Sequence, residues 1–171
     1  TIEMMGDLTV IESSSGQLIW TKGTGSIVFS SGTGTQTVNF LGRTVEDIEV
    51  ASTTATKQLV NPIETDSLTL SSGTFDSNGY PMRISTDWTK TNGNYLPNGS
   101  TVYFVGLETS TLSGASTFYS LVSTMPSKSL LFEAGTTFYV TNNLEWELVY
   151  LQSVSDGSTW YLDLKSGSTQ S

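Results

Sequence analysis

The sequence contains no cysteine and no histidine. Without cysteine there are no disulfides, thiolate nucleophiles or cysteine-based metal sites. Without histidine the chain lacks the commonest general base, the commonest metal ligand and the neutral-pH switch. We therefore expect a protein that is not an enzyme, with no catalytic, cofactor-binding or metal-binding residues.

Charge is also scarce, because only 13% of the residues are charged against about a quarter in ordinary domains. The net charge is −9, and the seven basic residues are scattered along the chain. Nucleic-acid binding needs clustered Lys or Arg, and an acidic protein is repelled by anionic membrane surfaces. No apolar run approaches the roughly 20 residues that span a bilayer. We expect no nucleic-acid partner and no membrane insertion.

Ser, Thr, Gly and Asn fill the place of the missing charges, while aromatic residues still reach 11%. Disordered chains are usually poor in aromatics and rich in charge, so this composition indicates an ordered fold coated with hydroxyls and amides. A length of 171 residues suits one domain or a short array of repeats. The chain begins Thr1-Ile2, from which we expect a processed protein or a piece of a longer one.

Short β-branched and aromatic runs separated by Gly, Asn and Ser dominate the chain and predict strands. Alternation favours strand over helix in Val45 to Val50 and in Leu144 to Tyr150 as well. The other expected strands are Leu8 to Ile11, Ser26 to Phe29, Gln36 to Phe40, Leu68 to Leu70, Val102 to Val105, Thr136 to Val140, Leu148 to Leu151 and Trp160 to Leu164.

An internal repeat is the main organising signal. Residues 25–38 align without gaps to residues 99–112, 74 positions later (Gly25 to Gly99), with six of 14 identical. Upstream, Trp20-Thr21-Lys22 matches Trp88-Thr89-Lys90. Such repeats usually form stacked units with one continuous core. We predict a single β-solenoid domain over residues 1–171, with matching segments at about 20–50 and 88–124. The 74-residue unit between them would hold about three coils of some 25 residues.

The segment DSLTLSSGTFDSNGYPMRISTDWTKTNGNYLPNGSTVYFVG, Asp66 to Gly106, resembles the parallel β-helix repeats of large secreted and surface-anchored bacterial proteins of the filamentous-adhesin and autotransporter-passenger type. Residues 34–38, 116–121, 132–138 and 158–162 are similar to later parts of that pattern. The resemblance implies a right-handed parallel β-helix that serves as a stalk, adhesin or surface filament. The chain departs from the pattern at Pro81, at Met125-Pro126 and in the charged segment Leu144 to Leu148.

Asn78-Gly79 allows three interpretations. An Asn-Gly pair between alternating strands is typical of a two-residue hairpin. Asp76 and Asn78 could begin a calcium loop, but no third ligand or distant Glu is in register. In a wound coil the pair supplies positive φ at a corner. Because Pro81 follows the turn and lacks an N–H for a ladder, we favour the corner.

Acidic pairs on one strand face could serve as the acid and base of a glycosidase. The candidates are Asp47 with Glu49, beside Glu46, and Glu145 with Glu147. Residues i and i+2 of any strand meet that distance, so a solvated strand face is the favoured interpretation.

Three further features suggest ligands or modification. Trp20, Trp88, Trp146 and Trp160 could form a sugar-stacking platform, although packing between coils is favoured. Asn98-Gly99-Ser100 fits a glycosylation acceptor pattern. The pairs Thr35/Thr37 and Thr109/Thr111 could belong to an ice-binding face, but a threonine ladder between coils is preferred.

The sequence thus predicts an all-β parallel β-helix, with a β-sandwich or jelly roll as the alternative. We expect an extracellular or cell-surface structural protein, a subunit or fragment of a filament, stalk or adhesin. It would associate through strand edges or solenoid ends with copies of itself or with the rest of a longer chain. The alternatives are a carbohydrate-binding or carbohydrate-active module, with surface glycans as partners, and a viral coat or fibre protein.

Overall fold

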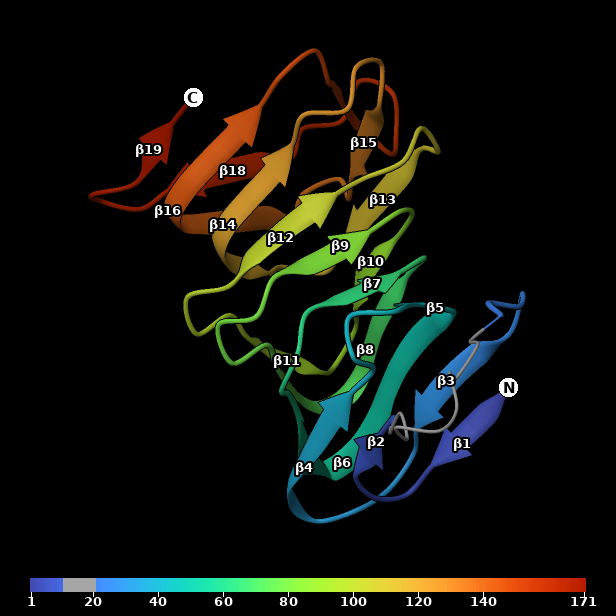
Figure 1. The fold of residues 1–171 in the computed structure, drawn as a ribbon. Coiled ribbons are helices and arrows are strands. Elements are labelled where there is room, and N and C mark those ends of the chain that lie inside the picture. Colours follow the sequence, from blue (N-terminus) through green and yellow to red (C-terminus); the bar gives the residue numbers. More distant parts are fainter. Residues whose placement is uncertain (11–20) are drawn as a thin grey trace.

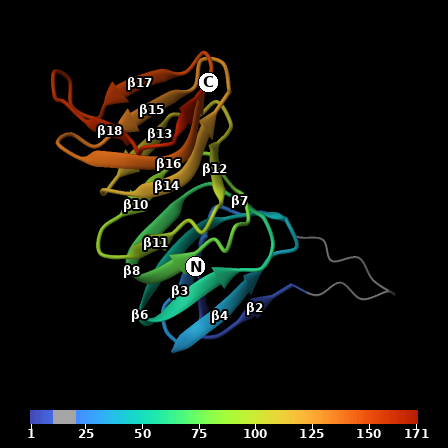
Figure 2. The same cartoon turned by 90° about the vertical axis from the view of Figure 1, so that its left-hand side faces the viewer.

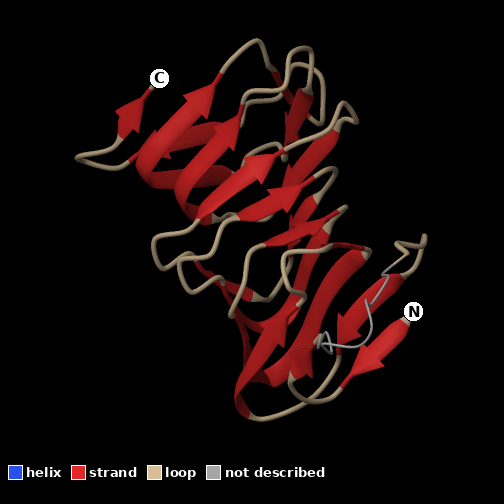
Figure 3. Ribbon diagram, viewed as in Figure 1, coloured by secondary structure: helices blue, strands red, loops and turns tan. Residues whose placement is uncertain are grey.

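A computed structural model describes residues 1–10 and 21–171, and in this part of the chain all regular structure is β-strand (Figure 3). The strands wind into a parallel β-solenoid of about 7 turns, with the first strands at one end and the last at the other (Figure 1). Every strand pair in the described residues is parallel. The alternative β-sandwich, which requires antiparallel hairpins, is therefore wrong.

Each coil contributes strand segments to three faces, which wrap around the core (Figure 2). Face 1 is formed by β1 (Ile2–Met4), β3 (Ser26–Phe29), the first parts of β6 (Asp47–Leu59) and β8 (Leu68–Asp76), β10 (Trp88–Lys90), β13 (Ser110–Ser113), β15 (Ser129–Phe132) and β17 (Tyr150–Ser153). Face 2 is formed by β2 (Leu8–Thr9), β4 (Gly34–Asn39), the second parts of β6 and β8, β11 (Asn94–Leu96), the first parts of β14 (Thr117–Ser123) and β16 (Thr137–Trp146), and β18 (Tyr161–Leu164). Face 3 is formed by β5 (Thr44–Val45), β7 (Ile63–Thr65), β9 (Met82–Ile84), β12 (Thr101–Phe104), the second parts of β14 and β16, and β19 (Thr169–Gln170).

Inward positions of neighbouring coils lie side by side and form apolar columns. On face 1 the register places Ile27 beside Ile48, Ile48 beside Leu68 and Leu68 beside Trp88. The step between coils is about 20 residues there, and it lengthens to 24 between Trp88 and Leu112. Alternation along each strand puts these residues in the core and their neighbours on the surface, as the sequence pattern predicts.

An aromatic cluster fills the middle of the solenoid, where the strands of face 2 change sheet. β11 belongs to the 11-stranded sheet and β14 to the 8-stranded sheet. The rings of Trp88 and Phe118 meet edge to face at 4.9 Å, and Tyr95 lies 4.8 Å from Trp88. Such pairs contribute beyond their buried area, so the cluster supports the fold where backbone pairing is interrupted.

The stretch around Asn78-Gly79 is a corner, as predicted. Both residues have positive φ, 49° and 78°, and Tyr80 N donates to Ser77 O over 2.8 Å. The turn leads from β8 on face 2 to β9 on face 3, which do not pair with each other. Asn98-Gly99 repeats the same turn between β11 and β12. The hairpin interpretation is therefore wrong.

The repeat character of the chain is confirmed, but the alignment at an offset of 74 residues is not the structural one. Val28 lies half-buried on the outside of β3, in the 11-stranded sheet. Val102 is buried inside β12, in the 8-stranded sheet. Trp88 lies three coils after Ile27, and Leu112 lies four coils after it. An offset of 74 residues falls between these two, so it does not correspond to a whole number of coils. Trp20 lies outside the described residues, so the predicted match of Trp20 to Trp88 is not described.

Candidate functional site

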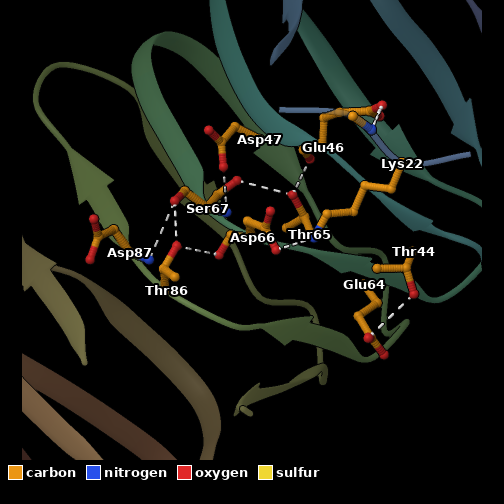
Figure 4. Close-up of polar contacts among 11 residues, drawn as sticks. Lys22, Thr44, Glu46, Asp47, Glu64, Thr65, Asp66, Ser67, Thr86 and Asp87 are labelled. Carbon is orange, nitrogen blue, oxygen red and sulfur yellow. Dashed lines mark hydrogen bonds and ion pairs between the residues drawn. The ribbon is translucent and has the colours of Figure 1, made fainter. Parts of the chain in front are cut away.

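Hydroxyls and carboxylates form a continuous column where face 3 turns into face 1 (Figure 4). The Asp47 carboxylate accepts a hydrogen bond from Ser67 N over 3.0 Å, and the Ser67 and Thr86 hydroxyls are 2.7 Å apart. Asp87 N donates to the Ser67 hydroxyl over 3.4 Å. The Asp87 carboxylate accepts from Thr111 N over 2.8 Å. We call Asp47, Ser67, Thr86 and Asp87 the corner column.

The flanking contacts of the corner column also connect different coils. The Thr65 hydroxyl donates to Glu46 O, and the Thr86 hydroxyl donates to Asp66 O over 3.0 Å. Lys22 and Asp66 form an ion pair whose side chains are 33% and 34% exposed. A partly exposed pair of this kind contributes about 0–1 kcal/mol, so the hydrogen bonds to backbone atoms contribute more to stability.

The three carboxylates of the predicted acidic cluster bind three different groups in two segments, one before and one after them in the chain. The Glu46 side chain accepts from Gly23 N over 2.8 Å, and Asp47 accepts from Ser67 N. The Glu49 side chain accepts from the Ser71 hydroxyl over 2.6 Å. Each carboxylate thus joins its strand to a neighbouring segment, and this arrangement supports structural roles rather than an acid–base pair.

Glu145 and Glu147 do not share a strand. Glu145 lies in β16, paired with Val122, whereas Glu147 follows the end of β16, where its N donates to Ser123 O. Within residues 1–10 and 21–171, no three Asp or Glu residues gather closely enough to hold a metal ion. No helix in this part of the chain is long and apolar enough to cross a membrane.

Asp76, the proposed start of a calcium loop, is occupied by protein donors. One carboxylate oxygen accepts from Asn78 N over 2.7 Å and from Asn98 Nδ2 over 2.8 Å, and the other accepts from Gln58 Nε2 over 2.9 Å. A cation would have to displace these donors, so the geometry favours a structural carboxylate. The Asn98 nitrogen to which a glycan would be attached takes part in the same contact.

The tryptophans pack against the core rather than forming a platform. Trp88 is 0% exposed, and its indole nitrogen donates to Ser116 Oγ over 2.9 Å. Trp160 stacks on Phe132 with centroids 4.0 Å apart, and Trp146 lies partly buried against the same ring. The preferred interpretation, packing between coils, therefore describes these three residues.

A threonine ladder exists and includes the predicted Thr35, but its other members differ from the predicted ones. Thr35 pairs with Thr56, which pairs with Thr74, along the outside of face 2. Thr111 lies in β13 on face 1, and Thr109 lies in the loop before β13. The two predicted Thr-x-Thr pairs therefore share no surface.

Two buried lysines were missed at the sequence level. Lys128 is 0% exposed, and its Nζ donates to Ser85 O over 3.0 Å and to Glu108 O over 2.7 Å. Burial lowers the pKa of Lys128 to about 8, although Glu108 and Asp87 act in the opposite direction. Since the two acceptors lie in two earlier corners, this lysine joins three coils.

Lys57 is the second buried lysine, at 0% exposure, on the inward side of β6. Its Nζ donates to Ser31 O over 2.8 Å and to the side-chain oxygen of Gln36. Burial lowers the pKa of Lys57, and the charge of Asp7 opposes this shift. Sequence alternation does carry a signal, because Lys57 shares the inward phase of Ala55 and Leu59.

A buried hydroxyl network lies beside the aromatic cluster. The Tyr95 hydroxyl is 2.9 Å from Ser100 Oγ and 3.3 Å from Ser77 Oγ, and the two serine oxygens are 2.7 Å apart. Burial raises the pKa of Tyr95 to about 12. Ser77 also donates to the backbone of the next coil, at Pro97 O over 2.8 Å, so these polar atoms join coils as well.

Comparison of the chain with protein-family models, with curated proteins and with solved structures finds no match. The description of the fold and of the corner column therefore rests on the structure alone.

Proposed function

We propose that the protein is an extracellular structural module, a segment of a surface filament, stalk or adhesin that extends by stacking at the ends of its solenoid. The observation that supports this proposal is the incomplete burial of the inward side chains of the last coil. Leu151 pairs with Leu130, and Leu162 pairs with Phe138. Leu130 and Phe138 are 0% exposed, whereas Leu151 and Leu162 are only half-buried. The core is thus partly open at this end.

The edge of β17 supports the same proposal. Tyr150 N donates to Lys128 O and Val154 N donates to Phe132 O, so these amides face β15. Because successive amides of a strand point to opposite sides, the N–H groups of Leu151 and Ser153 face away from β15. Within the described residues, no strand pairs with that side of β17. An unpaired edge of this kind is a template for another strand.

Charge favours stacking at the ends over side-by-side contact. The chain carries a net charge of −9, so the acidic walls of two copies repel each other. The end of the last coil instead presents the half-buried leucines of the open core, Leu151 and Leu162. The partner we propose is therefore a second copy of the chain, stacked along the axis. The hydroxyl-rich, cysteine-free surface suits an extracellular or cell-surface location.

Sedimentation velocity over a range of concentrations tests this function. Wild type should form larger species as concentration rises, and Leu151→Lys should abolish them because it places a charge on the open core. Gln152→Lys, on the outward side of the same strand, is the matched control and should still associate. A wild-type chain that stays a monomer at every concentration would refute the proposed stacking.

A second candidate function is binding of neutral polysaccharide, favoured by tyrosines on the outside of face 2. Tyr119, Tyr139 and Tyr161 lie on three successive coils, and Tyr119 and Tyr161 are 37% and 54% exposed. Aromatic faces of this kind can stack on sugar rings. A polysaccharide pull-down with wild type and Tyr161→Ala tests it, because binding should fall in the variant. Equal retention of both proteins, or of neither, would exclude this role for Tyr161.

A further inference from the structure

A lysine amine and a glutamine carboxamide meet inside the first coils. Lys57 in β6 is paired directly with Gln36 in β4. The Lys57 Nζ contacts the Gln36 side-chain oxygen and donates to Ser31 O over 2.8 Å. Lys57 is 0% exposed and Gln36 is half-buried, so the amine is held against the carboxamide in a site partly shielded from solvent.

The backbone around the carboxamide fixes its position. Gly32 has φ +115°, which favours glycine, and a Cβ at this residue would overlap the Gln36 carboxamide in its present position. The Gln36 Nε2 donates to Met5 O over 3.3 Å. The ring centroid of Phe29 lies 5.4 Å from the Lys57 Nζ and gives the amine an apolar neighbour. The carboxamide is therefore held between a backbone carbonyl on one side and the amine on the other.

The surroundings also favour the reactive form of the amine. Burial lowers the pKa of Lys57, and this increases the neutral fraction that carries a nucleophilic lone pair. The negative charge of Asp7 acts against that shift. Two groups held in contact react with a high effective concentration.

We propose that Lys57 and Gln36 join in an intramolecular amide bond that links two successive coils. The lone pair of Lys57 Nζ forms a bond to Gln36 Cδ, and the bond between Cδ and Nε2 breaks. One Nζ proton moves to Nε2, which leaves as ammonia. The reaction needs no oxidant and no second reactant, and it replaces a buried amine by a neutral secondary amide.

Lys128 provides an internal contrast. It is also 0% exposed and also makes two hydrogen bonds, but both acceptors are backbone carbonyl oxygens, of Ser85 and Glu108. No side-chain carboxamide contacts its Nζ among the described residues, so it has no comparable group to react with. A variant at Lys128 is therefore a matched control for one at Lys57.

Mass spectrometry of the intact, purified chain after incubation in mildly alkaline buffer tests the bond. Wild type should be lighter than its sequence mass by one ammonia, and a digest should contain one branched peptide that joins Gln36 to Lys57. Lys57→Met and Gln36→Leu should each have the full sequence mass, while Lys128→Met should still lose ammonia. Circular dichroism of each variant shows whether it is folded.

Two results would overturn the proposal. One is a wild-type mass equal to the sequence mass, with no branched peptide. The other is a loss of ammonia that persists in folded Lys57→Met, which would place the loss elsewhere, for example at Asn78-Gly79, whose side-chain amide can also be lost by cyclisation. If Lys57→Met does not fold, the branched peptide in wild type decides the question by itself.

Discussion

The indole nitrogen of Trp88 donates a hydrogen bond to the hydroxyl oxygen of Ser116, one coil further along, over 2.9 Å. Ser116 lies at the corner between β13 and β14, and its hydroxyl in turn donates to Gly114 O over 2.9 Å. Both residues are buried. The buried indole N–H of Trp88 thus finds its acceptor in the next coil.

Ser116→Ala should destabilise the protein by about 1–3 kcal/mol, because it leaves a buried indole N–H without an acceptor. Trp88→Phe removes the donor and some buried area, and in a double variant the two effects should not add. Urea unfolding of the two single variants and the double variant measures the coupling. Strict additivity would mean that the hydrogen bond contributes nothing.

Gly114→Ala should be far more damaging than Gly135→Ala. Both glycines have positive φ, +79° and +73°, so the backbone strain of an added side chain is about equal. A Cβ at Gly114 would overlap Lys90 O of the preceding coil, whereas a Cβ at Gly135 would meet nothing within 4 Å. Thermal unfolding of the two variants should show the difference. Equal midpoints would contradict the close approach of these coils.

Asp87→Ala should cost about 1.5–3 kcal/mol, because it removes a charged acceptor from the backbone N–H of Thr111. The matched control is Asp156→Ala, since Asp156 is exposed in the turn between β17 and β18. Chemical denaturation should show little change in the control. A similar loss in both variants would indicate a general effect of net charge instead of the corner column.

Lys128 should make the free energy of unfolding rise as pH increases from about 8 to 10.5. Burial lowers its pKa from 10.5 to about 8, so in that window the unfolded chain holds a proton that the folded protein has released. The rise amounts to at most about 3 kcal/mol, because one pKa unit corresponds to about 1.4 kcal/mol. A free Lys57 amine would act in the same direction, so the comparison must be with Lys128→Met, in which any contribution of Lys57 is the same.

In that comparison, wild type should gain stability relative to Lys128→Met across the window, as measured by urea unfolding at several pH values. Tyrosine ionisation affects both proteins and cancels in the difference. A difference that does not change with pH would show that Lys128 titrates in the folded protein at its ordinary pKa.

The alternation of apolar and polar residues identified most of the strands, because inward residues of a coil are mostly apolar and outward residues contact solvent. The segment from Val45 to Val50 shows both the success and its limit. It is β-strand, as its alternation predicts, but Glu46 interrupts it, so β5 and β6 lie on different faces. Coil boundaries of this kind depend on backbone turns that alternation does not encode.

The repeat alignment failed because identity in a Ser-, Thr- and Gly-rich chain does not fix the inward phase. Val28 and Val102 are identical in the alignment, yet Val28 points outward and Val102 points inward. Coils of unequal length, about 20 and 24 residues, also prevent any constant offset. A shift by one residue exchanges the two sides of a strand, so a correct alignment needs the burial pattern as well.

Contacts of single side chains were the least predictable part. The sequence marked Glu46, Asp47 and Glu49 as one cluster, but Glu46 binds the preceding coil at Gly23, whereas Asp47 and Glu49 bind the following coil at Ser67 and Ser71. Lys128 lies in a corner, where no alternation reveals which side chains turn inward. Such contacts follow from the register between coils, which local sequence does not state.

The most direct test of the account is amide hydrogen exchange at the open edge of β17, measured at low and at high protein concentration. If copies stack along the axis, protection of the Leu151 and Ser153 amides should rise with concentration, while the Tyr150 and Val154 amides, already bonded to β15, should change little. Exchange at Leu151 and Ser153 that is fast and independent of concentration would contradict the proposed stacking.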